Sequence, residues 1–252
     1  MHGTGSGIGD TEERNMKAFL LAAGYGTRLR PLTDTTPKCL IPINGKPLLT
    51  YWLELFSRHS VTDVLINTHY LREQVHDFIE RHNGSGQLPH AVEFYEPELL
   101  GSCGTVAANK DFVLNEDNFF ICYADNLTNI DLTAIYEFHK AHDAPLTMAL
   151  FRAGNPSQCG IAAMDECNRI IKFEEKPKAP KSNLANAGIY VADKRIYSYF
   201  PDKDFIDFGK DVLPYLTGNM YGWVTRDYLL DIGTPENYKK AQEGAVWITN
   251  QK

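Results

Sequence analysis

The chain has 252 residues, of which 25 are Lys or Arg and 32 are Asp or Glu, so its formal net charge is -7. The hydrophobic fraction of 43% is ordinary for a globular protein and too high for a disordered one. The acidic balance argues against a dedicated nucleic-acid binder, and no apolar run approaches the roughly 20 residues of a membrane-spanning helix. We therefore expect neither a nucleic acid nor a membrane as a partner.

Residues 1–15 are rich in glycine and polar residues, and we expect them to form a flexible leader, either native or left from cloning. Their glycines are not preceded by a strand, so they do not predict a dinucleotide-binding loop. Residues 16–252 are expected to form a single domain.

The first half of this domain alternates between apolar runs and amphipathic segments. Strands are predicted at 17–23, 63–68, 91–95 and 118–124, and helices at 47–59, 72–82 and 105–112. In the first helix Trp52 and Phe56 lie on the apolar face and are expected in the core. This alternation predicts an α/β layered sheet with parallel pairing.

The second half is less regular. Helices are predicted at 132–142, 208–216 and 235–244, short strands at 146–152, 161–164, 170–174 and 188–192, and one or two strands within 221–230. Short strands so close together indicate an antiparallel excursion beside the main sheet. No hexapeptide repeat occurs, so we expect no C-terminal β-helix domain.

The five cysteines are widely spaced and include no C-x-x-C pair, which argues against a disulfide framework or a structural zinc site. We expect Cys39, Cys103 and Cys122 to be buried thiols in a reducing, cytoplasmic setting. His139 and His142 form an H-x-x-H pair without an evident third ligand, so we expect surface or flanking histidines rather than a metal site.

The loop after the first strand carries the clearest functional pattern. Two glycines, Gly24 and Gly26, let backbone N–H groups approach a phosphate closely, and Thr27 adds a hydroxyl donor. Residues 24–46 include four cationic side chains and one anionic side chain, in a chain that is acidic overall. A phosphorylated ligand is therefore expected at the carboxyl end of the first strand. The loop lacks the G-K-[ST] ending of a Walker motif.

The string Gly24-Tyr25-Gly26-Thr27-Arg28-Leu29-Arg30-Pro31-Leu32-Thr33, followed by Pro37-Lys38, resembles the G-x-G-T-R-L-x-P-L-T and P-K signature of sugar-1-phosphate nucleotidyltransferases. Every defined position matches. Further segments are similar to parts of that family and follow in the same order along the chain. Segment 96–104 is similar to its nucleobase loop, and segments 173–177 and 186–190 together are similar to its sugar-binding pair. Segment 207–214 is similar to another segment typical of the family, and segment 231–235 is similar to its metal-bearing turn. The resemblance spans about residues 16–244.

That family joins a nucleoside triphosphate (NTP) to a sugar 1-phosphate and releases pyrophosphate and a nucleotide sugar. The resemblance implies a Rossmann-like, mixed and mainly parallel α/β sheet flanked by helices, as in GT-A enzymes, with the antiparallel excursion at the sugar site. The attacking phosphate has a second pKa of about 6 and is mostly ionised at neutral pH. We therefore expect direct in-line displacement that depends on cations and alignment rather than on a general base.

The resemblance also assigns roles to individual residues of this sequence. Those implied to bind the nucleotide are Leu21, Ala22, Ala23, Gly24, Gly26, Thr27, Glu96 and Gly101. Arg28, Lys38 and Lys176 are implied to be catalytic, through contacts with the phosphates of the two substrates. Gly160, Glu175, Asn186 and Gly188 are implied to bind the sugar, and Asp125 and Asp231 to hold Mg²⁺. Mg²⁺ takes oxygen ligands and keeps several waters, so two carboxylates together with phosphate oxygens suffice.

The nucleobase is less clearly indicated. A carboxylate at Glu96 accepts from both donors of guanine, whereas an amide suits uracil or thymine better. The string Leu100-Gly101-Ser102-Cys103-Gly104 is similar to the Leu-Gly-Thr-Ala-Gly of mannose- and heptose-1-phosphate guanylyltransferases, from which it departs at Ser102 and Cys103. We therefore favour GTP with a manno-configured sugar 1-phosphate and keep a uridylyl- or thymidylyltransferase as the alternative.

Two other classes remain to be weighed. A GT-A glycosyltransferase usually carries a D-x-D at the fourth strand, where this chain has Asp125-Asn126-Leu127. A non-catalytic regulatory homologue tends to lose the lysine or a metal aspartate, but this chain keeps Lys38, Asp125 and Asp231. The sequence does not indicate an oligomeric state.

Overall fold

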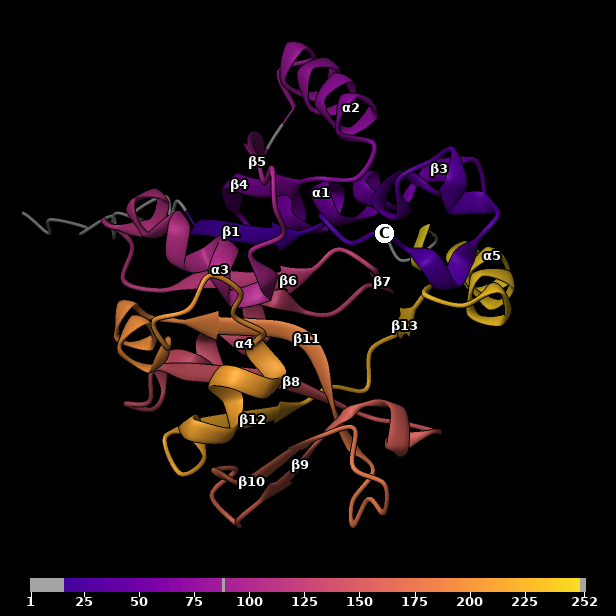
Figure 1. Cartoon of the computed structure of the whole chain (residues 1–252). Helices are drawn as coiled ribbons and strands as arrows, with labels where there is room; N and C mark the ends of the chain where they lie inside the picture. The colour runs from indigo at the N-terminus through magenta and orange to yellow at the C-terminus, as the bar shows by residue number, and fades with distance from the viewer. Residues whose placement is uncertain (1–15, 88, 250–252) are drawn as a thin grey trace, which may run out of the picture.

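The computed structural model describes residues 16–87 and 89–249, so the expected leader at 1–15 lies outside the described residues. A nine-stranded mixed sheet runs in the order β10-β9-β11-β6-β1-β4-β5, with β8 pairing β11 and β12 pairing β8 (Figure 1). Its strands are β1 Met16–Leu21, β4 Val61–Thr68, β5 His90–Tyr95, β6 Phe119–Tyr123, β8 Leu146–Arg152, β9 Gly160–Met164, β10 Ile170–Glu175, β11 Leu184–Ala192 and β12 Met220–Val224. The expectation of a mixed α/β sheet flanked by helices is confirmed.

The helices that flank the sheet are joined by several short helical turns. The helices are α1 Leu48–Arg58, α2 Arg72–Gly84, α3 Gly101–Ala108, α4 Leu132–Lys140 and α5 Pro235–Thr249. The turns are η1 Thr27–Leu29, η2 Leu32–Asp34, η3 Lys38–Leu40, η4 Lys110–Val113, η5 Pro156–Gln158, η6 Lys194–Tyr199, η7 Phe208–Val212 and η8 Leu213–Leu216. Two small ladders lie outside the main sheet: β2 Pro42–Ile43 with β3 Lys46–Pro47, and β7 Asn126–Thr128 with β13 Leu229–Asp231.

The parallel part of the sheet places three strand ends at one edge. In the register of β1 with its neighbours, Leu21 pairs with Asn67 of β4 and with Tyr123 of β6. The strands β6, β1, β4 and β5 are all parallel, whereas β11 joins β6 in the antiparallel sense. The residues that follow β1, β4 and β6 therefore emerge side by side, where α/β proteins bind their ligands.

Both faces of the sheet are buried. Phe19 and Leu20 are adjacent in β1 but belong to separate apolar clusters, because successive side chains of a strand point to opposite faces. Trp52 and Phe56 of α1 pack in the cluster with Leu20, as expected from their spacing. The indole N–H of Trp52 also donates to the carbonyl of Asn126, 2.9 Å away, and so fixes α1 against the start of β7.

The last helix returns to the beginning of the domain. Figure 1 shows α5, in yellow, beside the indigo segment that contains β3. The Tyr238 hydroxyl and the Gln242 side-chain amide both donate to the carbonyl of Pro42, at 3.0 and 2.9 Å. The turn that precedes α5 is thereby held near the loop that follows β1.

The structure corrects several element boundaries. The helix expected at 105–112 begins at Gly101 and ends at Ala108, so the segment interpreted as a nucleobase loop includes a first helical turn. The helix expected at 208–216 is a π-helical turn followed by a 3₁₀ turn, because Pro214 cannot continue the regular hydrogen-bond ladder. Strand β11 begins at Leu184 rather than 188, with an irregularity between Asn186 and Tyr190.

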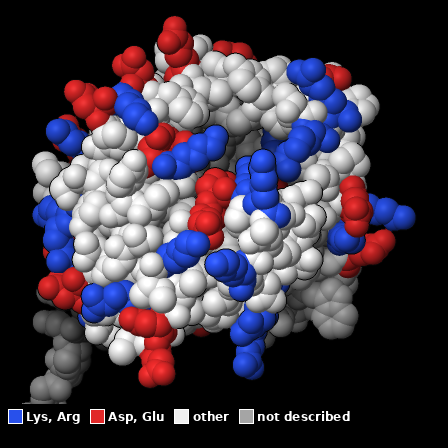
Figure 2. Space-filling view, turned by 60° about the horizontal axis from the view of Figure 1, so that its bottom comes forward, with Lys and Arg blue, Asp and Glu red and all other residues white. Residues whose placement is uncertain are grey.

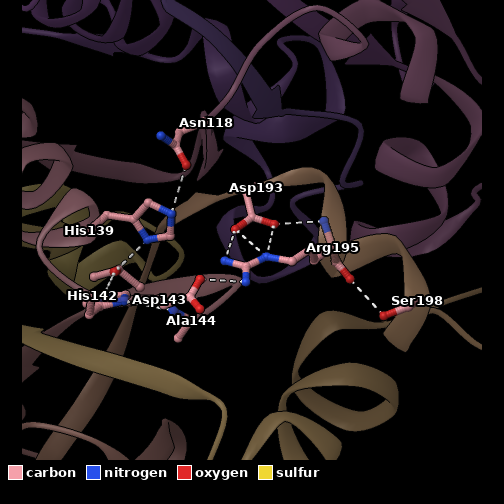
Figure 3. A network of polar contacts seen from close by, with 9 residues as sticks. Asn118, His139, His142, Asp143, Ala144, Asp193, Arg195 and Ser198 are labelled. Atoms are coloured by element: carbon pink, nitrogen blue, oxygen red, sulfur yellow. Dashed lines mark hydrogen bonds and ion pairs between the residues drawn. The ribbon is translucent and has the colours of Figure 1, made fainter.

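The expectation that His139 and His142 are surface or flanking residues is wrong for His139, which is only 3% exposed. Its ring contacts Thr147 Oγ1 at 2.8 Å and Asn118 Oδ1 at 3.1 Å, and His142 contacts the same threonine oxygen (Figure 3). Burial lowers the pKa of His139 to about 4. The pair therefore belongs to a polar network between α4 and β8, and no group of three or more His, Cys, Asp or Glu side chains suited to a metal occurs among the described residues.

The expected burial of Cys39, Cys103 and Cys122 is confirmed, and all five cysteines are free thiols. Within residues 16–87 and 89–249, no helix has the length and apolar character needed to cross a membrane.

Candidate active site

Two aspartates that are far apart in the sequence meet through the small ladder of β7 and β13. Asp125 directly precedes β7 and Asp231 ends β13, and in the antiparallel register Asp231 pairs with Asn126. The backbone N–H of Ile232 donates to the carbonyl of Asp125, 3.0 Å away. This short pairing places both carboxylates beside the carboxyl end of β6.

The ammonium group of Lys38 lies between these carboxylates. Its Nζ is 2.8 Å from Asp125 Oδ2 and 3.3 Å from Asp231 Oδ1, and the side chain is only 11% exposed. Arg28 Nη2 lies 3.8 Å from the other oxygen of Asp231, with most of its side chain in solvent. Two carboxylates that share one cation form an arrangement that can also hold a divalent metal ion.

The loop after β1 is folded tightly around Gly26. This residue has φ +64, and a Cβ there would lie 2.8 Å from Thr33 Cγ2 and 3.1 Å from Lys38 Cβ. The Thr33 hydroxyl donates to the Gly26 carbonyl at 2.8 Å. Glycine is required here both for the left-handed backbone and for the close approach of the segment that carries Lys38.

A first cavity of about 270 Å³ opens at the carboxyl ends of β1, β4 and β6. It is lined by Leu21, Ala22, Ala23, Gly24, Lys38, Cys39, Asn67, Glu96, Leu99, Gly101, Ser102, Tyr123, Ala124, Asp125 and Phe205. The Asn67 side chain accepts from the N–H of Ala22, 2.6 Å away, and thereby ties the end of β4 to the end of β1. Except for Lys38, Glu96 and Asp125, this lining carries no charged side chain.

Glu96 lines the first cavity but is only 1% exposed. Its Oε1 accepts from the Asn67 side-chain amide at 2.8 Å and from the Thr105 hydroxyl, and its Oε2 accepts from the backbone N–H of Leu100 at 3.1 Å. The carboxylate therefore connects β4, α3 and the loop between β5 and α3. A contact of Glu96 with a nucleobase stays a prediction.

A second, larger cavity of about 870 Å³ also reaches the aspartates. It contains the four residues expected to bind the sugar, Gly160, Glu175, Asn186 and Gly188, together with Arg28, Lys176, Asp125 and Asp231. Tyr123 and Asp125 line both cavities, so the two cavities adjoin at one of the paired carboxylates.

Two glycines make room for the carboxylate of Glu175. A Cβ at Gly160 or at Gly209 would lie 2.7 Å from Glu175 Oε2. Burial raises the pKa of Glu175, while Lys176, with its Nζ 3.6 Å away, acts in the opposite direction. The close packing holds Glu175 facing the second cavity and leaves its oxygens as acceptors for hydroxyl groups.

Lys176 and Asn186 are also held in defined conformations. Lys176 has a left-handed backbone with φ 47, fixed by its N–H donating to the carbonyl of Cys159 at 3.1 Å. The Asn186 side chain donates to the Tyr190 hydroxyl at 2.6 Å and accepts from the N–H of Gly188 at 2.9 Å. The Lys176 side chain remains largely exposed, so its ammonium is free to contact an anion in the second cavity.

Of the residues assigned by resemblance, only Gly26 and Thr27 lie outside the linings of both cavities. Figure 2 shows that one face of the molecule is hollowed, with Lys and Arg side chains around the hollow and Asp and Glu side chains within it. Such a mixture of cations and carboxylates suits polyanionic ligands that bind together with a cation.

The sequence profile of the family described as Nucleotidyl transferase matches residues 17–246, nearly the whole chain. The chain belongs to this nucleotidyl transferase family. A mannose-1-phosphate guanylyltransferase of Mycobacterium tuberculosis is 32% identical over 235 residues, which are 91% of this chain and 64% of that protein. A UTP–glucose-1-phosphate uridylyltransferase of Synechocystis is 31% identical over 246 residues, or 92% of this chain and 63% of that protein. The chain thus spans less than two thirds of the length of these relatives.

Among solved structures, HddC from Yersinia pseudotuberculosis complexed with GMP-PN is similar to this chain. The TM-score is 0.75 and the sequence identity 26%, and the match covers 91% of this chain and 99% of the other.

Several residues that line the two cavities were not assigned a role from the sequence. Asn67 carried a usable signal, because it is a polar residue that directly follows the apolar run 64–66 near the carboxyl end of β4. Ser102, one of the two departures from the guanylyltransferase string, accepts from the N–H of Phe208 at 2.8 Å. Phe205 carried no signal, since no motif or periodicity marks its position.

Proposed function

We propose that this chain transfers a nucleotidyl group from an NTP to a sugar 1-phosphate, with GTP and a mannose- or manno-heptose-type sugar as the favoured substrates. The observation that carries the proposal is that two cavities adjoin at Asp125, where Lys38 and Asp231 also meet. The reaction requires two anionic ligands to meet at one charged centre, and two cavities that share Asp125 suit this requirement.

The first cavity suits the nucleotide. It lies at the carboxyl ends of parallel strands, next to a glycine loop whose N–H groups can approach phosphates. We assign the triphosphate to Arg28 and Lys38, since a guanidinium binds phosphate oxygens in pairs and an ammonium acts as a compact charge. The second cavity suits the sugar 1-phosphate, with Glu175 and Asn186 for its hydroxyls and Lys176 for its phosphate.

Asp125 and Asp231 would hold Mg²⁺, because both already approach a single cation in this structure. When bound, the metal supplies charge neutralisation for the triphosphate. The donor set fits this ion, which takes few protein ligands and keeps several waters.

The chemical step is an in-line exchange at the α-phosphorus of the NTP. An oxygen of the sugar phosphate forms a new P–O bond, the bond to the bridging oxygen of the β-phosphate breaks, and pyrophosphate leaves with the electron pair. Lys176 orients the attacking phosphate, and Arg28 and Lys38 stabilise the charge on the leaving group. No proton transfer is needed, because the attacking phosphate is already ionised near neutral pH.

The preference for GTP is supported by the similarity to a mannose-1-phosphate guanylyltransferase and to a structure complexed with GMP-PN. A uridylyltransferase of nearly equal identity supports the alternative of a uridylyl- or thymidylyltransferase. A cytoplasmic setting stays a prediction.

The test measures pyrophosphate release with each of GTP, UTP, dTTP, ATP and CTP against a panel of sugar 1-phosphates, with and without Mg²⁺. We expect release only with Mg²⁺, and the fastest release with GTP and mannose 1-phosphate or a manno-heptose 1-phosphate. Release restricted to UTP or dTTP would establish the alternative. If no pair of substrates releases pyrophosphate and the chain instead hydrolyses a nucleotide sugar or transfers its sugar, the proposal is wrong and the activity is that of a GT-A glycosyltransferase. Nucleotide-sugar binding without any turnover would indicate a regulatory homologue.

A further inference from the structure

One wall of the first cavity comes from a distant part of the chain. Phe205 lies in the segment between η6 and η7, yet it lines the cavity together with residues from the ends of β1, β4 and β6. The neighbouring backbone is bonded to the start of α3. The N–H of Ile206 donates to the carbonyl of Leu100 at 2.9 Å, and the carbonyl of Ile206 accepts from the N–H of Cys103 at 2.9 Å.

Two further contacts fix this segment. The N–H of Phe208 donates to the hydroxyl of Ser102 at 2.8 Å. Gly101 has φ +80, and a Cβ there would lie 2.5 Å from the carbonyl oxygen of Ile206. Glycine at this position is what allows the segment to approach the start of α3. The backbone at Phe205 is therefore held at a fixed place beside the predicted nucleobase loop.

The side chain of Phe205 differs from its neighbours in burial. Ile206 and Phe208 are 4% and 0% exposed, whereas Phe205 is 53% exposed. Within the described part of the chain, no ring or cationic group stacks on it. An aromatic ring that is held on a fixed backbone, faces a ligand cavity and has a free face is suited to stack on a planar ligand.

We propose that Phe205 forms the stacking wall of the nucleobase site and contributes to the preference for a purine. This inference rests on the nucleotidyl transfer proposed above and concerns the nucleotide side of that site. A purine offers this ring a larger π-face than a pyrimidine. Glu96, which is held by three protein donors, then shapes the base pocket mainly through the position of its loop.

The test compares equilibrium binding of GTP and UTP, without sugar phosphate, to the unaltered chain and to Phe205→Ala and Phe205→Tyr. Tyr215→Ala is the matched control, because Tyr215 is a 73% exposed aromatic residue outside both cavities. We expect Phe205→Ala to weaken GTP binding about tenfold, the scale of one lost base–aromatic stack, with a smaller loss for UTP. Phe205→Tyr keeps the ring and should stay within about twofold, and Tyr215→Ala should change neither affinity.

Kinetics provide a second readout. Phe205→Ala should raise the KM for the NTP and leave the KM for the sugar 1-phosphate unchanged, which a general loss of structure would not do. Undiminished GTP affinity in Phe205→Ala, with normal binding by the unaltered chain, would overturn this inference and leave the proposed function standing. Failure of the unaltered chain to bind any NTP would overturn both.

Discussion

Lys38 Nζ lies 2.8 Å from Asp125 Oδ2, and the same ammonium reaches Asp231 Oδ1 at 3.3 Å. One cation from the loop after β1 thus bridges carboxylates that end two separate segments of the chain. In the proposed reaction these carboxylates hold the metal and the lysine contacts the triphosphate. The lysine and the metal are therefore alternative counter-ions for the same pair of aspartates.

Replacing Lys38 by Met should change metal binding and turnover in opposite directions. Without the ammonium, the two carboxylates attract a divalent ion more strongly, so Mn²⁺ affinity in the absence of nucleotide should rise about tenfold or more. Turnover should fall about 100-fold or more, because a charge contact with the leaving group is lost. Mn²⁺ titration followed by electron paramagnetic resonance measures the first effect, and pyrophosphate release the second.

The matched control for Lys38→Met is Lys46→Met. Lys46 pairs with Glu54, 2.6 Å away, and lines neither cavity. This control should leave both readouts unchanged. An unaltered Mn²⁺ affinity in Lys38→Met would contradict the idea that the lysine competes for the metal position.

Asp125→Asn and Asp231→Asn should each abolish Mg²⁺-dependent pyrophosphate release while the fold survives. An amide keeps the size of the side chain but removes the charge that binds the ion. Both aspartates are partly exposed, and each replacement leaves the nearly buried Lys38 paired with the other carboxylate, so the ammonium keeps a counter-charge. Thermal unfolding and Mn²⁺ titration separate a lost metal site from a lost fold, and Asp77→Asn on the exposed face of α2 is the control. Undiminished turnover in both variants would remove the metal assignment.

The sequence could predict those parts of the candidate site whose residues belong to short, contiguous motifs. Asp125 follows an apolar strand, and Gly24, Gly26 and Lys38 stand in one loop, so each could be placed from its immediate neighbours. The ladder of β7 with β13 could not be predicted, because a three-residue strand shows no periodicity and its partner lies about a hundred residues further along. That ladder is what brings Asp231 to Asp125.

Long-range packing also explains the remaining errors. The expectation that His139 is a surface or flanking residue rested on the missing third metal ligand of the H-x-x-H pair. The spacing of Leu132, Ile135 and His139 places all three on the buried face of α4, where Thr147 and Asn118 satisfy the imidazole. Phe205 could not be assigned, because the backbone bonds that hold its segment to α3 leave no trace in its own sequence.

Replacing Glu96 by Gln tests whether this residue reads the base or holds the loop. Its two oxygens accept from Asn67, Thr105 and the N–H of Leu100, and an amide would turn one acceptor into a donor facing a donor. We expect a loss of about 1–3 kcal/mol in the free energy of unfolding, together with weaker binding of both GTP and UTP. Glu98→Gln in the same loop is the control. Unchanged stability with a clean shift of preference from GTP to UTP would instead identify Glu96 as the base-reading group.

The stability of the fold should fall between pH 7 and pH 5 through His139. Burial lowers the pKa of His139 to about 4 and also lowers the pKa of the adjacent His142, so the unfolded chain binds more protons than the folded one in this range. Asp193, Arg195 and Asp143 lie beside the pair (Figure 3), and the two aspartates raise the pKa of a neighbouring histidine whereas Arg195 lowers it. Because the folded pKa lies below the usual 6.5, stability is greatest above that value and decreases as the pH falls towards 4. His139 alone should contribute a decrease of about 2 kcal/mol from pH 7 to pH 5.

Urea unfolding of the unaltered chain and of His139→Gln at both pH values isolates this contribution, because the other titrating groups cancel in the difference. His139→Gln should be less stable at pH 7, since its contacts with Thr147 and Asn118 are altered, but its loss between pH 7 and pH 5 should be smaller by about 2 kcal/mol. His90→Gln, at an exposed position of β5, should reproduce the pH dependence of the unaltered chain. An equal loss in His139→Gln and the unaltered chain would show that the buried imidazole is not the group that responds to pH.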